Sequence, residues 1–99
     1  MIEWDYPPRC QSPHVASPRS HCERLTWNAP REREKGRVRV VRWTCDCEAI
    51  FFELCQAGGL RFIRRTKRTA GNPLVEESDR WPATEADAVW AALLFGLVR

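Results

Sequence analysis

The sequence lacks the long apolar runs that mark a membrane span or a secretory signal. Its most apolar helical stretch, residues 88–98, is far shorter than the roughly 20 residues that a membrane helix needs. Residues 1–6 are acidic and aromatic, and they contain no apolar signal-peptide core. These absences predict a cytoplasmic protein that does not contact membranes.

Signatures of catalysis are also missing. There is no glycine-rich phosphate loop, since the paired Gly58 and Gly59 fit a tight turn only. No pair of carboxylates stands in an apolar setting, and although His21 adjoins Cys22, sequence neighbours rarely face each other usefully. We therefore expect a protein that is not an enzyme, and the sequence indicates no small-molecule substrate.

Core-forming residues are scarce in the first third of the chain. The chain has 99 residues, which is one domain, and residues 1–36 hold five of its seven prolines and few aliphatics. We expect residues 1–36 to form an arm on a body of residues 37–99. Trp4, Tyr6 and Trp27 are the large apolar anchors that would hold this arm to the body or to a partner.

The body has the patterns of a small α+β fold. Residues 37–45, 60–66 and 74–78 are predicted strands, because they are rich in β-branched and aromatic residues or follow turn signals. Residues 48–56 fit a buried strand or a short helix, and their β-forming composition favours the strand. A helix capped by Thr84 carries an apolar stripe that runs to Leu97. We predict an antiparallel sheet of three or four strands with one C-terminal amphipathic helix.

Cysteine is the most informative residue type in this chain. Five cysteines without a secretory signal suggest reduced thiols, which are better interpreted as metal ligands than as disulfides. Zinc takes four soft or borderline ligands in a tetrahedron. The candidate ligands are Cys10, Cys22, Cys45 and Cys47, with His14 and His21 as alternates.

Cys45 and Cys47 lie one residue apart and would supply two of the four ligands. Cys10 with Cys22 is the first choice for the other two, because it gives an all-thiolate zinc site that tethers the arm. A histidine in place of Cys10 would give a site of three cysteines and one histidine. Cys55 lies beyond a predicted strand and is expected to be a core thiol. The alternative to a metal site is that all five cysteines are small apolar fillers or incidental.

Basic residues are concentrated on the predicted strands. The total charge is close to balance, with 16 Lys and Arg against 13 Asp and Glu, so their placement matters more than the sum. A positive stripe across the open sheet face would bind phosphates of nucleic acid or an acidic protein surface. Alternatively, Glu76, Glu77 and Asp79 would neutralise it. The candidate contact residues are Arg37, Arg39, Arg61, Arg64, Arg65, Lys67 and Arg68.

Three functions fit these observations. The preferred one is a non-enzymatic, zinc-stabilised binding or regulatory protein that contacts nucleic acid or a protein partner. The second is a metal-free homodimer that buries the open sheet face or the aromatic arm against a second copy. The third is a thiol redox sensor that uses Cys45 and Cys47, whose closely spaced thiols would form a strained disulfide.

Overall fold

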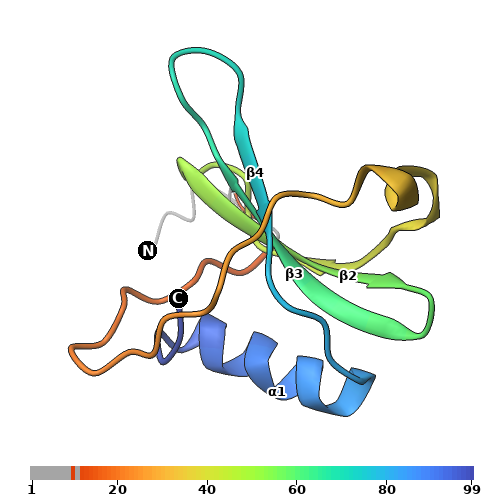
Figure 1. Ribbon diagram of the computed structural model, residues 1–99. Coiled ribbons are helices and arrows are strands. Elements are labelled where there is room, and N and C mark those ends of the chain that lie inside the picture. Colours follow the sequence, from red (N-terminus) through yellow and green to blue (C-terminus); the bar gives the residue numbers. More distant parts are fainter. Residues whose placement is uncertain (1–9, 11) are drawn as a thin grey trace, which may run out of the picture.

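The body of the protein is a four-stranded antiparallel sheet with one helix packed against one of its faces (Figure 1). The computed structural model describes residue 10 and residues 12–99. A 3-10 helix η1 (Glu32–Arg37) is followed by β1 (Arg39–Trp43), β2 (Ile50–Ala57), β3 (Leu60–Lys67), β4 (Leu74–Glu77) and α1 (Ala83–Leu94). The sheet order is β1-β2-β3-β4, so each strand pairs with its neighbour in the chain. The predicted α+β fold is confirmed.

The β2–β3 hairpin is the centre of the sheet. Gly58 and Gly59 connect the strands with φ angles of +60° and +83°, a left-handed conformation that glycine adopts without penalty. Ala57 then pairs with Leu60, and the pairing runs without interruption to Ile50 and Lys67. The segment that fits either a strand or a helix by sequence is therefore a strand, paired on both sides.

The main core lies between the sheet and α1. Phe52, Leu54 and Ile63 project from the sheet onto the helix and are at most 2% exposed. The helix contributes Ala86, Trp90 and Leu93 at helical spacing, which is the predicted apolar stripe. The opposite sheet face holds a smaller cluster of three buried residues, Cys55, Ala57 and Phe62, covered by Val38 and Val40.

Both ends of α1 differ from the prediction. The helix begins at Ala83 with Pro82 as its N-cap and no side-chain capping bond, so Thr84 lies inside the first turn. Proline suits this position because its missing N–H would have no helical partner. The helix ends at Leu94, before the predicted Leu97, because Gly96 turns the chain with a φ of +78°.

The N-terminal arm follows the body by backbone pairing. Glu23 forms a parallel bridge with Val98, and Asn28 forms an antiparallel bridge with Glu77 of β4. Trp27 lies between them, where its indole N–H donates to the main-chain oxygen of Arg99. Figure 1 shows the arm passing beside the C-terminal end of α1 before it crosses the sheet. The anchors Trp4 and Tyr6 lie outside the described residues.

Two further features complete the fold. Residues 32–36, near the end of the arm, lie within the 3-10 helix η1. Across the described part of the chain, no helix has the length and apolar character needed to cross a membrane.

Candidate metal centre

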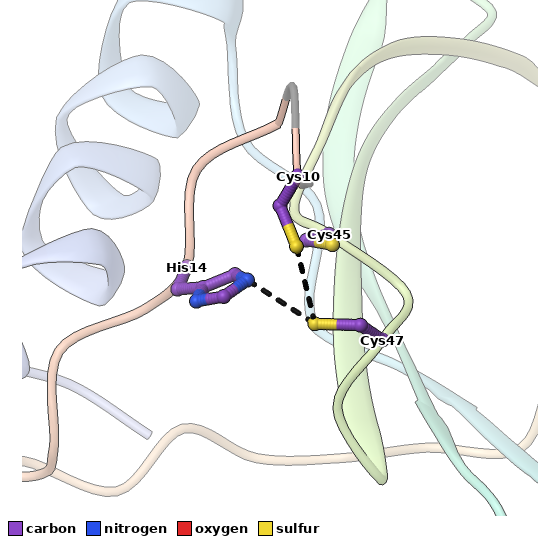
Figure 2. Close-up of side chains that lie close together, drawn as sticks. All are labelled: Cys10, His14, Cys45 and Cys47. Atoms are coloured by element: carbon purple, nitrogen blue, oxygen red, sulfur yellow. Dashed lines mark hydrogen bonds between the residues drawn. The ribbon is translucent and has the colours of Figure 1, made fainter. Parts of the chain in front are cut away.

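Four potential metal ligands meet where the arm approaches the β1–β2 loop (Figure 2). Cys10 and His14 come from the arm, and Cys45 and Cys47 come from the loop. The Cys10 thiol donates to the sulfur of Cys47 over 3.6 Å, and His14 Nε2 lies 3.2 Å from that sulfur. All four ligand atoms lie within 4.8 Å of one another. These residues are therefore close enough to hold one metal ion.

Backbone hydrogen bonds position the two halves of this cluster. Buried Thr44 closes the β1–β2 loop, because its N–H donates to the Phe52 carbonyl over 2.9 Å and its hydroxyl accepts from the Phe52 N–H. The next residue, Cys45, donates its N–H to the carbonyl of Pro13 over 2.9 Å. That bond joins the loop to the arm at the residue before His14. It therefore holds the arm ligands, Cys10 and His14, close to the loop ligands, Cys45 and Cys47.

The spacing of the ligand atoms suits a tetrahedral site. Zinc–sulfur bonds of about 2.3 Å place two sulfurs about 3.8 Å apart at the corners of a regular tetrahedron. The two sulfurs of Cys10 and Cys47 are 3.6 Å apart, and His14 Nε2 is 3.2 Å from the Cys47 sulfur, so both distances are close to the edges of such a tetrahedron. The widest separation in the cluster is within 4.8 Å. A small contraction of the widest separations would complete the coordination.

The three thiols of the cluster differ in acidity in the absence of a metal. A hydrogen bond from the Cys47 backbone, helped by the side chains of Cys10, Cys47 and His14, lowers the pKa of Cys45 to about 7. Hydrogen bonding with Cys45 and then Cys10 raises the pKa of Cys47 to about 12. The pKa of Cys10 is also raised, chiefly by Cys45. One thiolate is therefore available near neutral pH to begin metal capture.

A carboxylate lies behind the imidazole of the cluster. Glu48 Oε1 is 3.9 Å from His14 Nδ1, while the other ring nitrogen, Nε2, faces Cys47. A histidine that ligates a metal commonly has a carboxylate or carbonyl beside its second nitrogen, which fixes the tautomer. Glu48 stands in that position.

The other candidate ligands are placed elsewhere. Cys22 and His21 are not members of the cluster; the N–H of Cys22 donates to the Arg19 carbonyl in a turn of the arm. The structure thus brings His14, named only as an alternate, to the place for which Cys22 was the first choice. Cys55 is fully buried in the smaller core cluster, and burial raises its pKa to about 11. It is a core thiol, as expected.

The arginines of β3 do not form one stripe on the open face. Arg61 bonds Asp87 of α1 over 2.8 Å, and Arg65 pairs with Glu76 while its guanidinium stacks 4.2 Å from the ring of Trp27. Both side chains therefore lie on the helix side of the sheet. Arg64 points to the opposite face, where it bonds Glu53 over 2.8 Å. Carboxylates thus offset much of the positive charge that the sequence concentrates in this strand.

Of the remaining basic candidates, Arg37, Arg39 and Arg68 are exposed, and Lys67 is half-buried. Arg68 lies 3.9 Å from Asp46 and 5.5 Å from the ring of Phe51. Arg37 ends η1 and Arg39 begins β1, and both are exposed. Lys67 ends β3. Within the described residues, Arg37, Arg39 and Lys67 have no carboxylate at ion-pair distance.

Comparisons with known proteins give no relative. The chain matches no protein-family model, no curated protein and no solved structure. The functional argument therefore depends on the geometry of this chain alone.

Proposed function

We propose that this chain is a small, non-enzymatic binding protein whose arm is held to its sheet by a structural zinc ion. Cys10, His14, Cys45 and Cys47 would be the ligands. The observation that carries the proposal is that these four side chains, from two segments more than 30 residues apart, gather their ligand atoms within 4.8 Å.

The donor set favours zinc over other metals. Three thiolates and one imidazole are a soft to borderline set, whereas calcium and magnesium prefer oxygen ligands. Four protein ligands leave no open coordination position, which is typical of structural rather than catalytic zinc. Three thiolates would outweigh the double positive charge of the zinc ion and leave the site with one net negative charge.

The proposed role of the centre is to stabilise a thin core. A domain of this size buries a modest fraction of its surface, and the arm adds only a few partly buried apolar side chains to the core. Metal binding to the folded state alone contributes to folding free energy directly. The zinc ion would thus fix the course of the arm, and with it the surface that the arm presents.

The proposed partner is nucleic acid or an acidic protein surface. Arg37, Arg39 and Lys67 support this, because they are basic side chains without an acidic partner among the described residues. The ion-paired arginines of β3 contribute less, since an ion pair must break before they contact a phosphate. The binding surface would therefore include the edge strand β1 rather than the whole sheet.

Native mass spectrometry before and after chelation tests the metal centre. We expect one zinc ion per chain, and we expect chelation to remove it together with the tertiary circular dichroism signal. A metal-free mass for protein purified in the presence of zinc would contradict the proposal. Binding to nucleic acid is tested separately by retention on a single-stranded DNA column at low salt, where Arg39→Glu should elute earlier than the wild type.

A second candidate function is self-association. Among the described residues, six large apolar side chains are exposed, of which Phe95 at 60% and Trp43 at 55% are the most exposed, and β1 is an edge strand. Burying such a surface against a second copy would remove it from water. Light scattering would test this, and a mass that stays monomeric at all concentrations would contradict it.

The redox sensor remains a third candidate. The sulfur atoms of Cys10 and Cys47 lie 3.6 Å apart, so these two residues are a second pair, beside Cys45 and Cys47, that would form a disulfide. Mild peroxide would oxidise two thiols to one disulfide, and a loss of two mass units per chain would support the sensor. An unchanged mass would count against it.

A further inference from the structure

A second site lies on the helix side of the sheet, in a cavity of about 530 Å³ between the arm and the adjoining ends of β2 and β3. We propose that this cavity binds a phosphate group carried on an apolar or aromatic body, as in a nucleotide. Its volume is within the range of small-molecule sites, roughly 300–1,000 Å³. The sequence alone indicates no such site, because its residues come from separate parts of the chain.

The cavity is strongly cationic. Arg24, Arg65, Lys67 and Arg99 line it, against the single carboxylate of Glu48. Arg65 is neutralised by Glu76, so two positive charges remain in excess. Like charges gathered in a concave, partly desolvated site favour the binding of an anion, and guanidinium groups match the geometry of phosphate oxygens.

Arg99 is the best positioned of these cations. Its guanidinium donates to the main-chain oxygens of Leu93, Val98 and Ala16, and it lies 5.8 Å from the ring of Phe52. These partners are neutral, so the positive charge is held in place and not cancelled. Burial lowers the pKa of Arg99, and no carboxylate side chain of residues 12–99 lies at ion-pair distance from its guanidinium. Its own main-chain oxygen accepts from Leu25 and Trp27.

Apolar residues form the remaining walls. Val15 and Pro18 of the arm and Ile50 and Phe52 of β2 line the cavity. Ile50 is 42% exposed, which leaves apolar surface open to a ligand. A charged end beside an apolar wall suits a phosphate joined to a base or another flat group better than it suits inorganic phosphate.

The site depends in part on the proposed metal centre. Val15 follows the ligand His14, and Glu48 follows the ligand Cys47, so the two segments that hold the cluster also supply two cavity walls. The proposal therefore rests on the proposed function for the order of the arm. The experiment must consequently report metal content and ligand binding in the same samples.

Titration with AMP, followed by the backbone amide signals of the labelled protein in about 0.15 M salt, tests the site. We expect shifts at residues 15–17, 48–50 and 99. Lys67→Glu and Arg24→Glu should each weaken AMP binding about tenfold or more, because each removes a charged contact and adds repulsion. Lys67→Arg should keep most of the affinity. Arg33→Glu is the matched control, with the same change in charge at an exposed residue of η1 outside the cavity, and should change affinity less than about twofold.

Parallel titrations identify the form of the ligand. Inorganic phosphate should bind more weakly than AMP, because it lacks the apolar part. If a short oligothymidylate binds more tightly than AMP, the ligand is a nucleic-acid strand. If AMP binds more tightly, the ligand is a free nucleotide. Either result supports a phosphate site. Absence of shifts with all three probes, or equal losses in Lys67→Glu and Arg33→Glu, would overturn it.

Native mass spectrometry of the same samples separates the two proposals. Zinc retained in Lys67→Glu, with AMP binding lost, supports the cavity independently of the metal. AMP binding by a wild-type protein that holds no zinc would contradict the metal centre and leave the phosphate site supported.

Discussion

Cys10 and Cys47 are 37 residues apart in the sequence, and their sulfur atoms lie 3.6 Å apart. That proximity depends on the β1–β2 loop and on an arm that has little regular secondary structure. If a zinc ion bridges them, removing one ligand should loosen the arm. Cys47→Ser should therefore lose the metal and at least about 2 kcal/mol of stability, or roughly 10 °C in Tm. Cys22→Ser is the control, since Cys22 lies outside the cluster. Equal metal loss in both variants would contradict the assignment of ligands.

Gly96 fixes the contact between the helix end and the arm. Its φ is +78°, and a Cβ at this position would overlap the carbonyl oxygen of Ser17. Gly96→Ala should cost about 2 kcal/mol or more in unfolding free energy, measured by urea denaturation. Gly71→Ala is the control, because nothing lies within 4 Å of the added atom there. Its effect should stay below about 0.5 kcal/mol.

Trp27 is the anchor of the arm within the described residues. Its ring lies beneath the Arg65 guanidinium at 4.2 Å, its centroid is 6.3 Å from that of Phe52, and its N–H donates to the Arg99 carbonyl. Trp27→Ala should lower the free energy of unfolding by about 2–3 kcal/mol. Trp43→Ala removes an equally large ring that is 55% exposed, and should cost less than about 1 kcal/mol. Similar losses for the two variants would show that Trp27 does not anchor the arm.

Thiol reactivity in the metal-free protein should follow the acidity of each cysteine. Only the thiolate reacts with iodoacetamide, and the pKa of Cys45 is lowered to about 7 while that of Cys47 is raised to about 12. Cys45 should be alkylated faster than Cys47 at pH 7, and its rate should fall as the pH is lowered through about 7, because the thiolate is then protonated. Cys55 should react last of these three because its side chain is fully buried and out of reach of the reagent, although its pKa of about 11 is below that of Cys47.

Peptide mapping by mass spectrometry after timed alkylation measures these rates. Zinc should protect Cys45 and Cys47 and leave Cys55 unchanged. Faster labelling of Cys47 than of Cys45 at pH 7 would contradict the hydrogen-bonding arrangement of the cluster.

Local sequence patterns predicted the body of the fold well. Paired glycines, β-branched runs and helical spacing each act over a few residues, and they located the β2–β3 hairpin and α1. They failed at the helix start, where Pro82 rather than Thr84 is the cap. Thr84 has the side chain of a good cap, but the helix already begins at Ala83, after Pro82, whose missing N–H would have no helical partner.

The site was harder to predict because the arm folds through distant backbone bonds. Ala16 donates to the Leu94 carbonyl and Cys45 donates to Pro13, and these bonds decide that His14 rather than Cys22 reaches the cluster. The spacing of cysteines and histidines along the arm does not predict these long-range backbone hydrogen bonds. The distribution of the β3 arginines over two sheet faces could have been predicted from the sequence. Side chains alternate along a strand, so Arg64 lies on the opposite face from Arg61 and Arg65.

The central claim is a zinc ion held by three cysteines and one histidine, and absorption spectroscopy at the zinc K-edge tests it most directly. The account predicts three sulfur ligands at about 2.3 Å and one nitrogen ligand at about 2.0–2.1 Å for the purified protein, and a changed first shell in His14→Ala. A shell of four sulfurs that persists in His14→Ala would contradict it, because Cys22 would then have to replace His14 as the fourth ligand.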